Sequence, residues 1–320
     1  MPITATTVVQ NYKMKNYLIV IVGPTAIGKT RAAIEIARHF HSEIVSCDSR
    51  QLYKEMKIGT AVPTAEELSA VPHHFIQNKS IFEDYSVGDY ERAVLPLLDA
   101  LFIKNPVQVL VGGSGLYVDA VLKGFDEFPE LSSEIKEEVE RDYQKYGITY
   151  LQKELEKLDP EYYLFLHTSN PQTLLNPQRM KRFVGVCKSS GMPYSSFLSK
   201  KEDHRNFTPI IIGLEADREI MYRRIENRID QMMKDGLLEE VIQLYPYKHL
   251  NALQTVGYRE FFSFLEEEIS LETAVNEVKK NTRRFAKRQL TWFKRSENTK
   301  WFDYQSDLQN IIQHIKQQIQ

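Results

Sequence analysis

The sequence is poor in cysteine and has no cysteine cluster. Its 320 residues include only Cys47 and Cys187, and neither lies in a Cys-x-x-Cys or Cys/His pattern. The sequence therefore supports neither a disulfide framework nor a zinc site. We expect both thiols to be buried as small apolar side chains.

Long apolar runs and a large net charge are missing as well. The longest apolar run, residues 17–22, is far too short to span a bilayer, and residues 1–15 lack the apolar core of a signal peptide. We therefore expect no membrane partner and a cytoplasmic location. With 41 basic and 43 acidic side chains the net charge is −2, so any affinity for nucleic acid must come from local patches.

A phosphate-binding motif directly follows that apolar run. We call it the phosphate loop, and it comprises Gly23, Pro24, Thr25, Ala26, Ile27, Gly28, Lys29 and Thr30. In such loops backbone N–H groups converge on phosphate oxygens, the lysine reaches the terminal phosphates, and the last hydroxyl ligates Mg²⁺. Residues 31–40 have helical spacing, which places the loop at a helix N-terminus that favours anions. We predict a bound polyphosphate, and a nucleoside triphosphate and an allylic diphosphate satisfy the motif equally.

Apolar, β-rich runs alternate with helical patterns along most of the chain. The runs span residues 17–22, 43–47, 107–111 and 209–214, with a short candidate at 300–304. This alternation predicts an α/β fold, a P-loop NTPase-like parallel sheet flanked by helices. We also expect one long helix over 218–240, further helices over 260–295, and a glutamine-rich tail from Gln305 that frays.

The β signal disappears between residues 125 and 205. Charged helical segments at 133–146 and 150–158 replace it, with breaks at Asp159-Pro160 and Asn170-Pro171. We expect an inserted all-helical domain over 125–205. The catalytic core is then formed by residues 1–124 and 206–320.

Two polar motifs follow predicted strands, at the edge where open parallel sheets bind ligands. Asp48 comes after the run 43–47 and suits metal binding or proton abstraction, although an aspartate taken alone more often caps a turn. Ser114 lies in Gly112-Gly113-Ser114-Gly115, after the run 107–111. We expect the glycines to form a tight turn that presents the serine hydroxyl.

A basic run lies near the end of the chain. Its eight cations fall within 17 residues that contain no acid, and they are Lys279, Lys280, Arg283, Arg284, Lys287, Arg288, Lys294 and Arg295. Val278, Phe285 and Trp292 recur every seven residues through the run, which predicts a helix with these three on the core side. By itself the run fits a solvated helix face and a nucleic-acid contact about equally well.

Six sequence blocks occur in a recognisable order between about Tyr17 and Trp301. They are GPTAIGKT, SCDSRQLYKEMKIGTA, LVGGSGLYVDAVLKG, NPQRMKRFVGV, TVGYREF and AKRQLTWFKR. In this order they resemble the tRNA dimethylallyltransferase family, also called tRNA isopentenyltransferases, of the bacterial type. The resemblance implies transfer of a dimethylallyl group from dimethylallyl diphosphate to N6 of the adenosine on the 3′ side of the tRNA anticodon, with release of pyrophosphate.

The resemblance also implies roles for particular residues. Asp48 would be the base that takes a proton from N6, Lys29 and Arg228 would stabilise the leaving diphosphate, and Thr30 would ligate the Mg²⁺ cofactor. Arg223 and Arg224 lie close enough in sequence to compete for the arginine role. Ser114 is a further catalytic candidate, and it stands where the family pattern leads us to expect threonine.

Predicted tRNA contacts are carried over in the same way. They are Asp48, Ser49, Arg50, Gln51, Ser114, Lys136, Gln178, Arg179, Met180, Lys181, Arg182, Gly257, Tyr258, Arg259, Lys287, Arg288 and Trp292. A structural or merely solvated role remains the alternative for each, although basic and aromatic side chains suit single-stranded RNA. Val62 and Gln254 depart from the basic residues common at those positions, which weakens single RNA contacts only.

Three other functions fit parts of the sequence. A small-molecule or nucleotide kinase explains the phosphate loop but leaves the basic run without a role. An adenylate isopentenyltransferase, acting on free nucleotide, leaves both the basic run and the insertion unexplained. A non-enzymatic RNA-binding switch gated by nucleotide would not need Asp48. We expect the active form to be a monomer.

Overall fold

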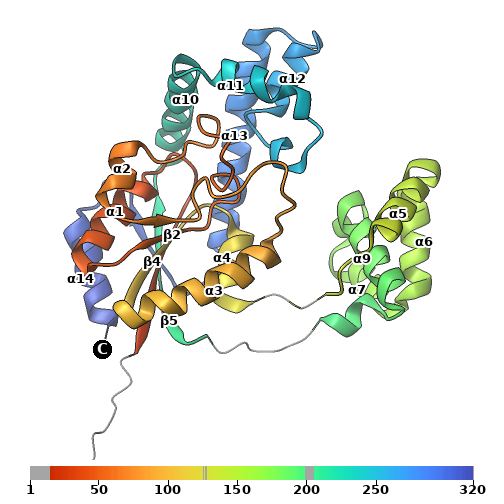
Figure 1. Cartoon of the computed structure of the whole chain (residues 1–320), viewed down its shortest axis with the longest axis horizontal. Helices are drawn as coiled ribbons and strands as arrows, with labels where there is room; N and C mark the ends of the chain where they lie inside the picture. Colours follow the sequence, from red (N-terminus) through yellow and green to blue (C-terminus); the bar gives the residue numbers. More distant parts are fainter. Residues whose placement is uncertain (1–14, 125, 127, 199–204, 320) are drawn as a thin grey trace, which may run out of the picture. The chain divides into compact units, whose positions relative to one another are not determined.

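The computed structural model describes residues 15–124, 126, 128–198 and 205–319. By its internal contacts the chain divides into two compact units (Figure 1). The sheet unit contains the described residues up to Lys123 and those from Arg205 onward, and the helical unit contains those from Gly124 to Leu198.

The sheet unit is built on a six-stranded sheet in which every strand pair is parallel. The strand order is β3-β2-β4-β1-β5-β6. The strands are β1 (Asn16–Val22), β2 (Ile44–Ser46), β3 (His73–His74), β4 (Val107–Val111), β5 (Phe207–Glu215) and β6 (Thr299–Asp303). The predicted parallel α/β fold is confirmed, and only the two-residue β3 was not predicted.

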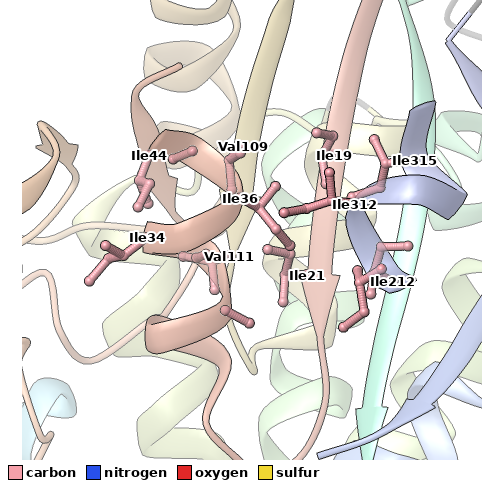
Figure 2. Packing of buried hydrophobic residues seen from close by; sticks show 14 of the residues in the cluster. Ile19, Ile21, Ile34, Ile36, Ile44, Val109, Val111, Ile212, Ile312 and Ile315 are labelled. Atoms are coloured by element: carbon pink, nitrogen blue, oxygen red, sulfur yellow. The ribbon is translucent and has the colours of Figure 1, made fainter. Parts of the chain in front are cut away.

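Helices cover both faces of the sheet, which explains why β1 is apolar throughout rather than alternating. Ile19 and Ile21 of β1 pack with helices α1 (Lys29–Phe40) and α14 (Leu308–Gln318), as Figure 2 shows for Ile36 and Ile312. Leu18, Val20 and Val22 point to the other face, where they pack against α3 (Val87–Lys104) and α4 (Gly115–Lys123). The buried Cys47 belongs to this second core, as expected for its thiol.

Two predictions about helices of the sheet unit are wrong. The expected single helix over 218–240 is divided into α10 (Arg218–Lys234) and α11 (Leu237–Leu244), because Gly236 adopts a left-handed conformation with φ of 99°. The tail expected to fray from Gln305 instead forms α14, since Ile311, Ile312 and Ile315 recur at helical spacing and are buried.

Six of the eight cations of the basic run lie on α13 (Leu271–Phe293), which follows α12 (Arg259–Leu265), and Lys294 and Arg295 come directly after the helix. The buried residues of α13 are Ala274, Val278, Ala286, Gln289 and Phe293, so the predicted core side is confirmed at Val278 but not at Phe285, and Trp292 is partly buried. Successive residues of an α-helix are rotated by about 100° from each other. Because Ala286 faces the core, the neighbouring Phe285 is turned away from it and is 38% exposed. The remaining α-helix of this unit is the short α2 (Ala65–Ala70), which begins with a capping box from Thr64 and Glu67.

The helical unit contains five α-helices and one 3-10 helix (Tyr194–Phe197) among its described residues. The α-helices are α5 (Ser133–Tyr146), α6 (Ile148–Leu158), α7 (Pro160–Ser169), α8 (Pro171–Leu174) and α9 (Pro177–Ser190). Its core includes Leu151, Leu155, Val184 and the buried Cys187. Side-chain caps from Ser132, Asp159 and Asn176 start α5, α7 and α9. Both predicted breaks are helix boundaries, at which Pro160 begins α7 and Pro171 begins α8. No helix among the described residues of either unit is long and apolar enough to cross a membrane.

Candidate active site

The phosphate loop joins β1 to α1 and presents backbone donors to a cavity. Gly28 caps α1 without a side-chain hydrogen bond, and within the described part of the chain the N–H groups of Gly28, Lys29 and Thr30 have no acceptor. Gly23 has φ of 148°, and a Cβ there would lie 2.5 Å from the Leu214 carbonyl oxygen. The cavity in front of the loop has a volume of about 580 Å³. Converging free N–H groups at a helix N-terminus suit a phosphate.

Lys29 is a half-buried cation that lines this cavity. Its Nζ donates to the Pro24 carbonyl oxygen at 2.7 Å. Burial lowers the pKa of Lys29 to about 8, and nearby Arg228 adds to this effect while Asp48 opposes it. An anion entering the cavity would favour the charged ammonium.

Two arginines of α10 lie one turn apart beside the loop, and both line the cavity. The Arg224 guanidinium donates to the Ala26 carbonyl oxygen at 2.8 Å, and Arg228 lies 3.5 Å from the Thr25 hydroxyl. Burial lowers the pKa of Arg228 from its ordinary value, against the opposing effect of Asp48. Arg223 is exposed and does not line the cavity. The geometry therefore favours Arg228 and Arg224 over Arg223.

Asp48 both caps a turn and faces the cavity. Its Oδ1 accepts the N–H groups of Arg50 at 2.9 Å and Gln51 at 3.3 Å. Oδ2 has no hydrogen-bond partner among the residues that the structure describes, and the side chain lines the cavity. The turn-capping alternative is thus correct for one oxygen, while the other remains available for chemistry.

Ser114 fixes the segment that carries Asp48. Its hydroxyl accepts the Ser49 N–H at 3.0 Å and donates to the Ser49 hydroxyl at 3.1 Å. The chain passes from β4 to α4 through this segment, and the connection needs no left-handed residue, because Gly112, Gly113 and Gly115 have no positive φ. A larger residue at two of these positions would clash with a neighbouring side chain. A Cβ at Gly112 would lie 2.5 Å from Cys47, and a Cβ at Gly113 would lie 2.3 Å from Gln289.

A second, mostly apolar cavity adjoins the first. It has a volume of about 120 Å³ and shares Thr25, Asp48 and Arg228 with the phosphate cavity. Its apolar walls are Ile225, Ile229, Met232, Leu237, Val278 and Phe285. This arrangement suits a ligand that has a charged phosphate end and a small apolar end.

The residues present fit Mg²⁺ bound together with a diphosphate. Thr30 lines the phosphate cavity, where its hydroxyl would supply one oxygen ligand. No group of three or more His, Cys, Asp or Glu side chains in the described ranges could hold a metal ion. Mg²⁺ bound mainly through ligand phosphates and water does not need such a group.

The predicted RNA contacts of the helical unit differ widely in exposure. Lys136, Gln178, Arg179 and Arg182 are exposed, whereas Lys181 is largely buried and pairs with Glu140 at 2.6 Å. Met180 is fully buried in the core of this unit. The prediction of an RNA contact is therefore wrong for Met180, because its side chain fills that core.

Burial also contradicts one predicted contact in the sheet unit. Tyr258 is fully buried, and its hydroxyl donates to Glu240 at 2.7 Å, so it serves the core rather than RNA. Gly257 is buried too, but its backbone lines the apolar cavity, and Arg259 is exposed. Arg50 donates to the carbonyl oxygens of Asn251 and Ala252, and Gln51 to those of Thr60 and Ala61. These two side chains hold neighbouring loops in place.

Ion pairs divide the basic run of α13 into two sets. Four cations pair with acids, Lys279 with Asp230, Lys280 with Glu277, Arg283 with Glu226 and Lys294 with Glu215. Within the described ranges no acid pairs with the other four, which are Arg284, Lys287, Arg288 and Arg295. Trp292 is only partly exposed, and its indole N–H donates to Asp119 at 3.0 Å. This bond docks α13 on α4.

Sequence reasoning missed two residues that shape the site. Gln289 of α13 is a buried polar side chain that contacts the phosphate loop. Glu240 accepts the backbone N–H groups of Lys57, Ile58 and Gly59, and so holds the loop before Thr60. Gln289 could have been found from its spacing with Ala286 and Phe293, which places a glutamine on the buried side of a helix.

The fold and the site together define a phosphate-loop protein whose polar cavity suits a phosphorylated ligand and adjoins an apolar cavity. A model of the family described as IPP transferase matches residues 51–297. The chain is 64% identical over 299 residues to the tRNA dimethylallyltransferase of Flavobacterium johnsoniae, covering 93% of this chain and 97% of the relative. It is 52% identical to the tRNA dimethylallyltransferase of Christiangramia forsetii, covering 96% and 99%.

Solved structures agree with these relatives. The full-length tRNA isopentenylpyrophosphate transferase of Bacillus halodurans matches with a TM-score of 0.68 and 36% identity, covering 95% of this chain and 96% of that one. A eukaryotic dimethylallyltransferase acting on tRNA shares the fold, with a TM-score of 0.75 at 23% identity, covering 95% and 77%. The chain belongs to the IPP transferase family, in its bacterial type, and is a transferase. The kinase and the non-enzymatic switch are not favoured.

Proposed function

We propose that the chain transfers a dimethylallyl group from dimethylallyl diphosphate to N6 of the adenosine 3′ of the anticodon in tRNA. The names of the relatives support tRNA prenylation. The observation that carries the proposal for this chain is the pair of cavities that meet at Thr25, Asp48 and Arg228. The diphosphate occupies the polar cavity, and the reacting carbon of the dimethylallyl group meets N6 of the adenine beside Asp48.

The leaving group is stabilised by charge that the protein holds in place. As the C–O bond breaks, negative charge grows on the diphosphate, and Lys29, Arg224, Arg228 and the free loop amides surround it. One donor of this kind contributes about 3 kcal/mol to a transition state in a site shielded from water. Mg²⁺ held through Thr30 would add positive charge at the same oxygens.

The nucleophile needs a base because the N6 lone pair is delocalised into the adenine ring. In the step, the N6–carbon bond forms, the carbon–oxygen bond breaks, pyrophosphate leaves, and Asp48 Oδ2 accepts one N6 proton. Oδ1 stays bonded to the Arg50 and Gln51 N–H groups, which hold the carboxylate in position. Ser114 supports this segment through Ser49.

The adenosine must leave the stacked anticodon loop to reach Asp48, as in other enzymes that act on a base. RNA binding then falls to exposed cations, which are Arg284, Lys287 and Arg288 on α13, Arg259 beside it, and Lys136, Arg179 and Arg182 on the helical unit. We place the reaction in the cytoplasm. We also propose that the active chain is a monomer, which sedimentation at micromolar concentration would test.

A label-transfer assay distinguishes this function from its rivals. The chain is incubated with dimethylallyl diphosphate labelled in the prenyl group and with an anticodon stem-loop or AMP as acceptor. A parallel reaction contains γ-labelled ATP and candidate hydroxyl acceptors. We expect label in the stem-loop only. Label in AMP would indicate a free-nucleotide isopentenyltransferase, and transfer from ATP would indicate a kinase.

A further inference from the structure

One buried polar side chain outside the assigned catalytic set touches the phosphate loop. Gln289 lies in the middle of α13 and is only 7% exposed. Its Oε1 accepts the Thr25 N–H at 2.9 Å, and its Nε2 donates to the Gly113 carbonyl oxygen at 2.8 Å. The side chain therefore joins the phosphate loop to the loop that carries Ser114.

The surroundings of Gln289 are shaped to fit it. A Cβ on Gly113 would lie 2.3 Å from Nε2, so the glycine leaves room for the amide. Trp292 lies one turn further along α13, and its ring N–H donates to Asp119. A Cβ on Gly115 would lie 2.3 Å from the Trp292 ring. Because an amide offers one acceptor and one donor group, glutamine satisfies both loops at once, which neither leucine nor glutamate of similar size does.

The same helix carries unpaired cations on its outer side. Lys287 and Arg288 precede Gln289 directly, and both are exposed. The helix that we expect to meet RNA thus also bonds the phosphate loop, through the side chain of Gln289.

We propose that Gln289 is a positioning residue that holds the phosphate loop in the form that binds the diphosphate. Thr25 contributes to both cavities, and its backbone is fixed by Gln289 rather than by another part of its own loop. Without the amide, the Thr25 N–H loses its buried acceptor and the loop can turn to find another. This inference rests on the proposed function, since it assigns the residue to that same diphosphate site.

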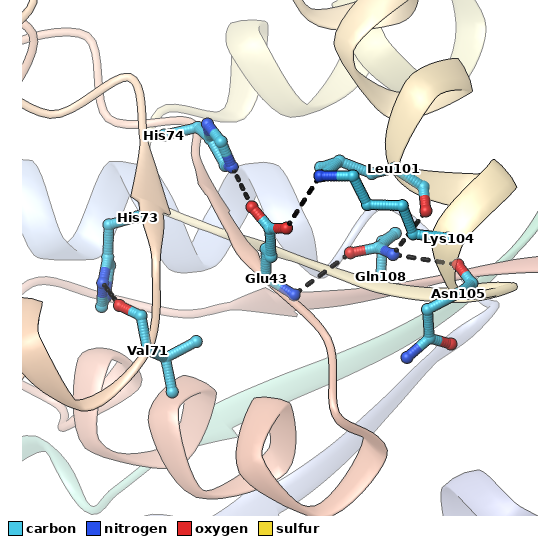
Figure 3. Close-up of polar contacts among 8 residues, drawn as sticks. All are labelled: Glu43, Val71, His73, His74, Leu101, Lys104, Asn105 and Gln108. Atoms are coloured by element: carbon cyan, nitrogen blue, oxygen red, sulfur yellow. Dashed lines mark hydrogen bonds and ion pairs between the residues drawn. The ribbon is translucent and has the colours of Figure 1, made fainter.

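A second buried glutamine provides a matched control. Gln108 is 1% exposed and accepts the Glu43 N–H at 3.2 Å, while it donates to the carbonyl oxygens of Leu101 and Asn105 (Figure 3). It joins backbone segments as Gln289 does, and neither glutamine itself lines a cavity. None of the residues that Gln108 bonds lines a cavity, whereas Gln289 bonds Thr25, which lines both. A purely structural role predicts equal consequences for Gln289→Leu and Gln108→Leu.

The test measures pyrophosphate binding by titration calorimetry, in the presence of Mg²⁺, for the full chain and both variants. We expect Gln289→Leu to weaken pyrophosphate binding by roughly tenfold or more, the effect of one lost buried hydrogen bond. Gln108→Leu should bind pyrophosphate like the unmodified chain, although both variants melt at lower temperature. Binding of an anticodon stem-loop should change less than twofold in either variant, and the KM for dimethylallyl diphosphate should rise only in Gln289→Leu.

A second substitution keeps the test decisive if Gln289→Leu does not fold. Gly113→Ala places a methyl group against Nε2 and displaces the amide without changing α13, so it should weaken pyrophosphate binding similarly. Unchanged pyrophosphate affinity in whichever of these two variants folds would overturn the inference. If the unmodified chain binds no pyrophosphate, the proposed function fails as well, and this outcome is distinct from failure of the inference alone.

Discussion

The two edges of the sheet use polar groups in opposite ways. At the amino edge, Glu43 accepts from His74 and pairs with Lys104, while Gln108 bonds three backbone groups around it (Figure 3). At the carboxyl edge, loop amides stay without acceptors, one carboxylate oxygen of Asp48 is free in the described structure, and burial lowers the pKa of the half-buried cations Lys29 and Arg228. Satisfied polar groups stabilise a fold, whereas preorganised, unsatisfied ones await a ligand.

The largest expected effect at the carboxyl edge comes from Asp48→Asn. The amide keeps an oxygen for the turn but cannot accept the N6 proton, so the rate of transfer in single turnover should fall about a thousandfold. Pyrophosphate and stem-loop affinities should change little. A rate within tenfold of the unmodified chain would show that another group is the base.

Exchange of a lysine at each edge compares the two edges directly. Lys29→Met removes a donor to the diphosphate and should lower the transfer rate by about a hundredfold or more. Lys104→Met removes an exposed partner of Glu43 and should leave the rate unchanged. Rapid-quench kinetics at saturating RNA measures both. Similar losses in the two variants would contradict the functional difference between the edges.

Gln108→Leu should destabilise the fold without impairing the chemistry. It leaves the Glu43 N–H and the carbonyl groups of Leu101 and Asn105 without their partner, which should cost about 1–3 kcal/mol in the free energy of unfolding. Urea unfolding gives the stability, and a transfer assay at a temperature where the variant is folded gives the rate. A large loss of rate with unchanged stability would reverse the roles that we give to the edges.

Pyrophosphate affinity should depend on pH through Lys29. The pKa of Lys29 is lowered to about 8 in the free chain, and a bound diphosphate should raise it. Affinity is therefore full below pH 8 and should weaken by up to about tenfold per pH unit as the pH rises above it. Calorimetry between about pH 7 and pH 9.5 measures this slope, and Lys29→Met should lack it. An equal slope in the variant would assign the dependence to another group.

The smallest effect should come from single cations of α13. Arg288→Ala removes an exposed cation without an acidic partner in the described structure, and Lys280→Ala removes one paired with Glu277 at 2.7 Å. Arg288→Ala should weaken stem-loop binding a few-fold and reduce its salt slope by about one phosphate contact. Lys280→Ala should change either quantity less. Equal effects would mean that ion pairing does not separate the two sets.

Sequence patterns predicted the elements whose residues are decided locally. The runs at 17–22 and 107–111 became β1 and β4, because a strand buried on both faces is mostly apolar. Gln108 is the polar exception in β4, and its amide is satisfied by backbone groups. Long-range packing decided the rest. Ile311 and Ile315 order a glutamine-rich helix against the sheet, and Met180 and Tyr258 turn inward although their blocks resemble RNA-binding ones. The role of Gln289 depends on the packing of α13 against two loops that lie more than 170 residues away in the sequence, so sequence patterns alone did not predict it.

Analysis of tRNA nucleosides by mass spectrometry tests the central claim most directly. Cells that lack this chain should lose dimethylallyl-adenosine and its derivatives from the anticodon loop. The unmodified chain and Gln108→Leu should restore the nucleoside at a permissive temperature, whereas Asp48→Asn should not. An unchanged nucleoside profile in cells without the chain, or full restoration by Asp48→Asn, would contradict the account.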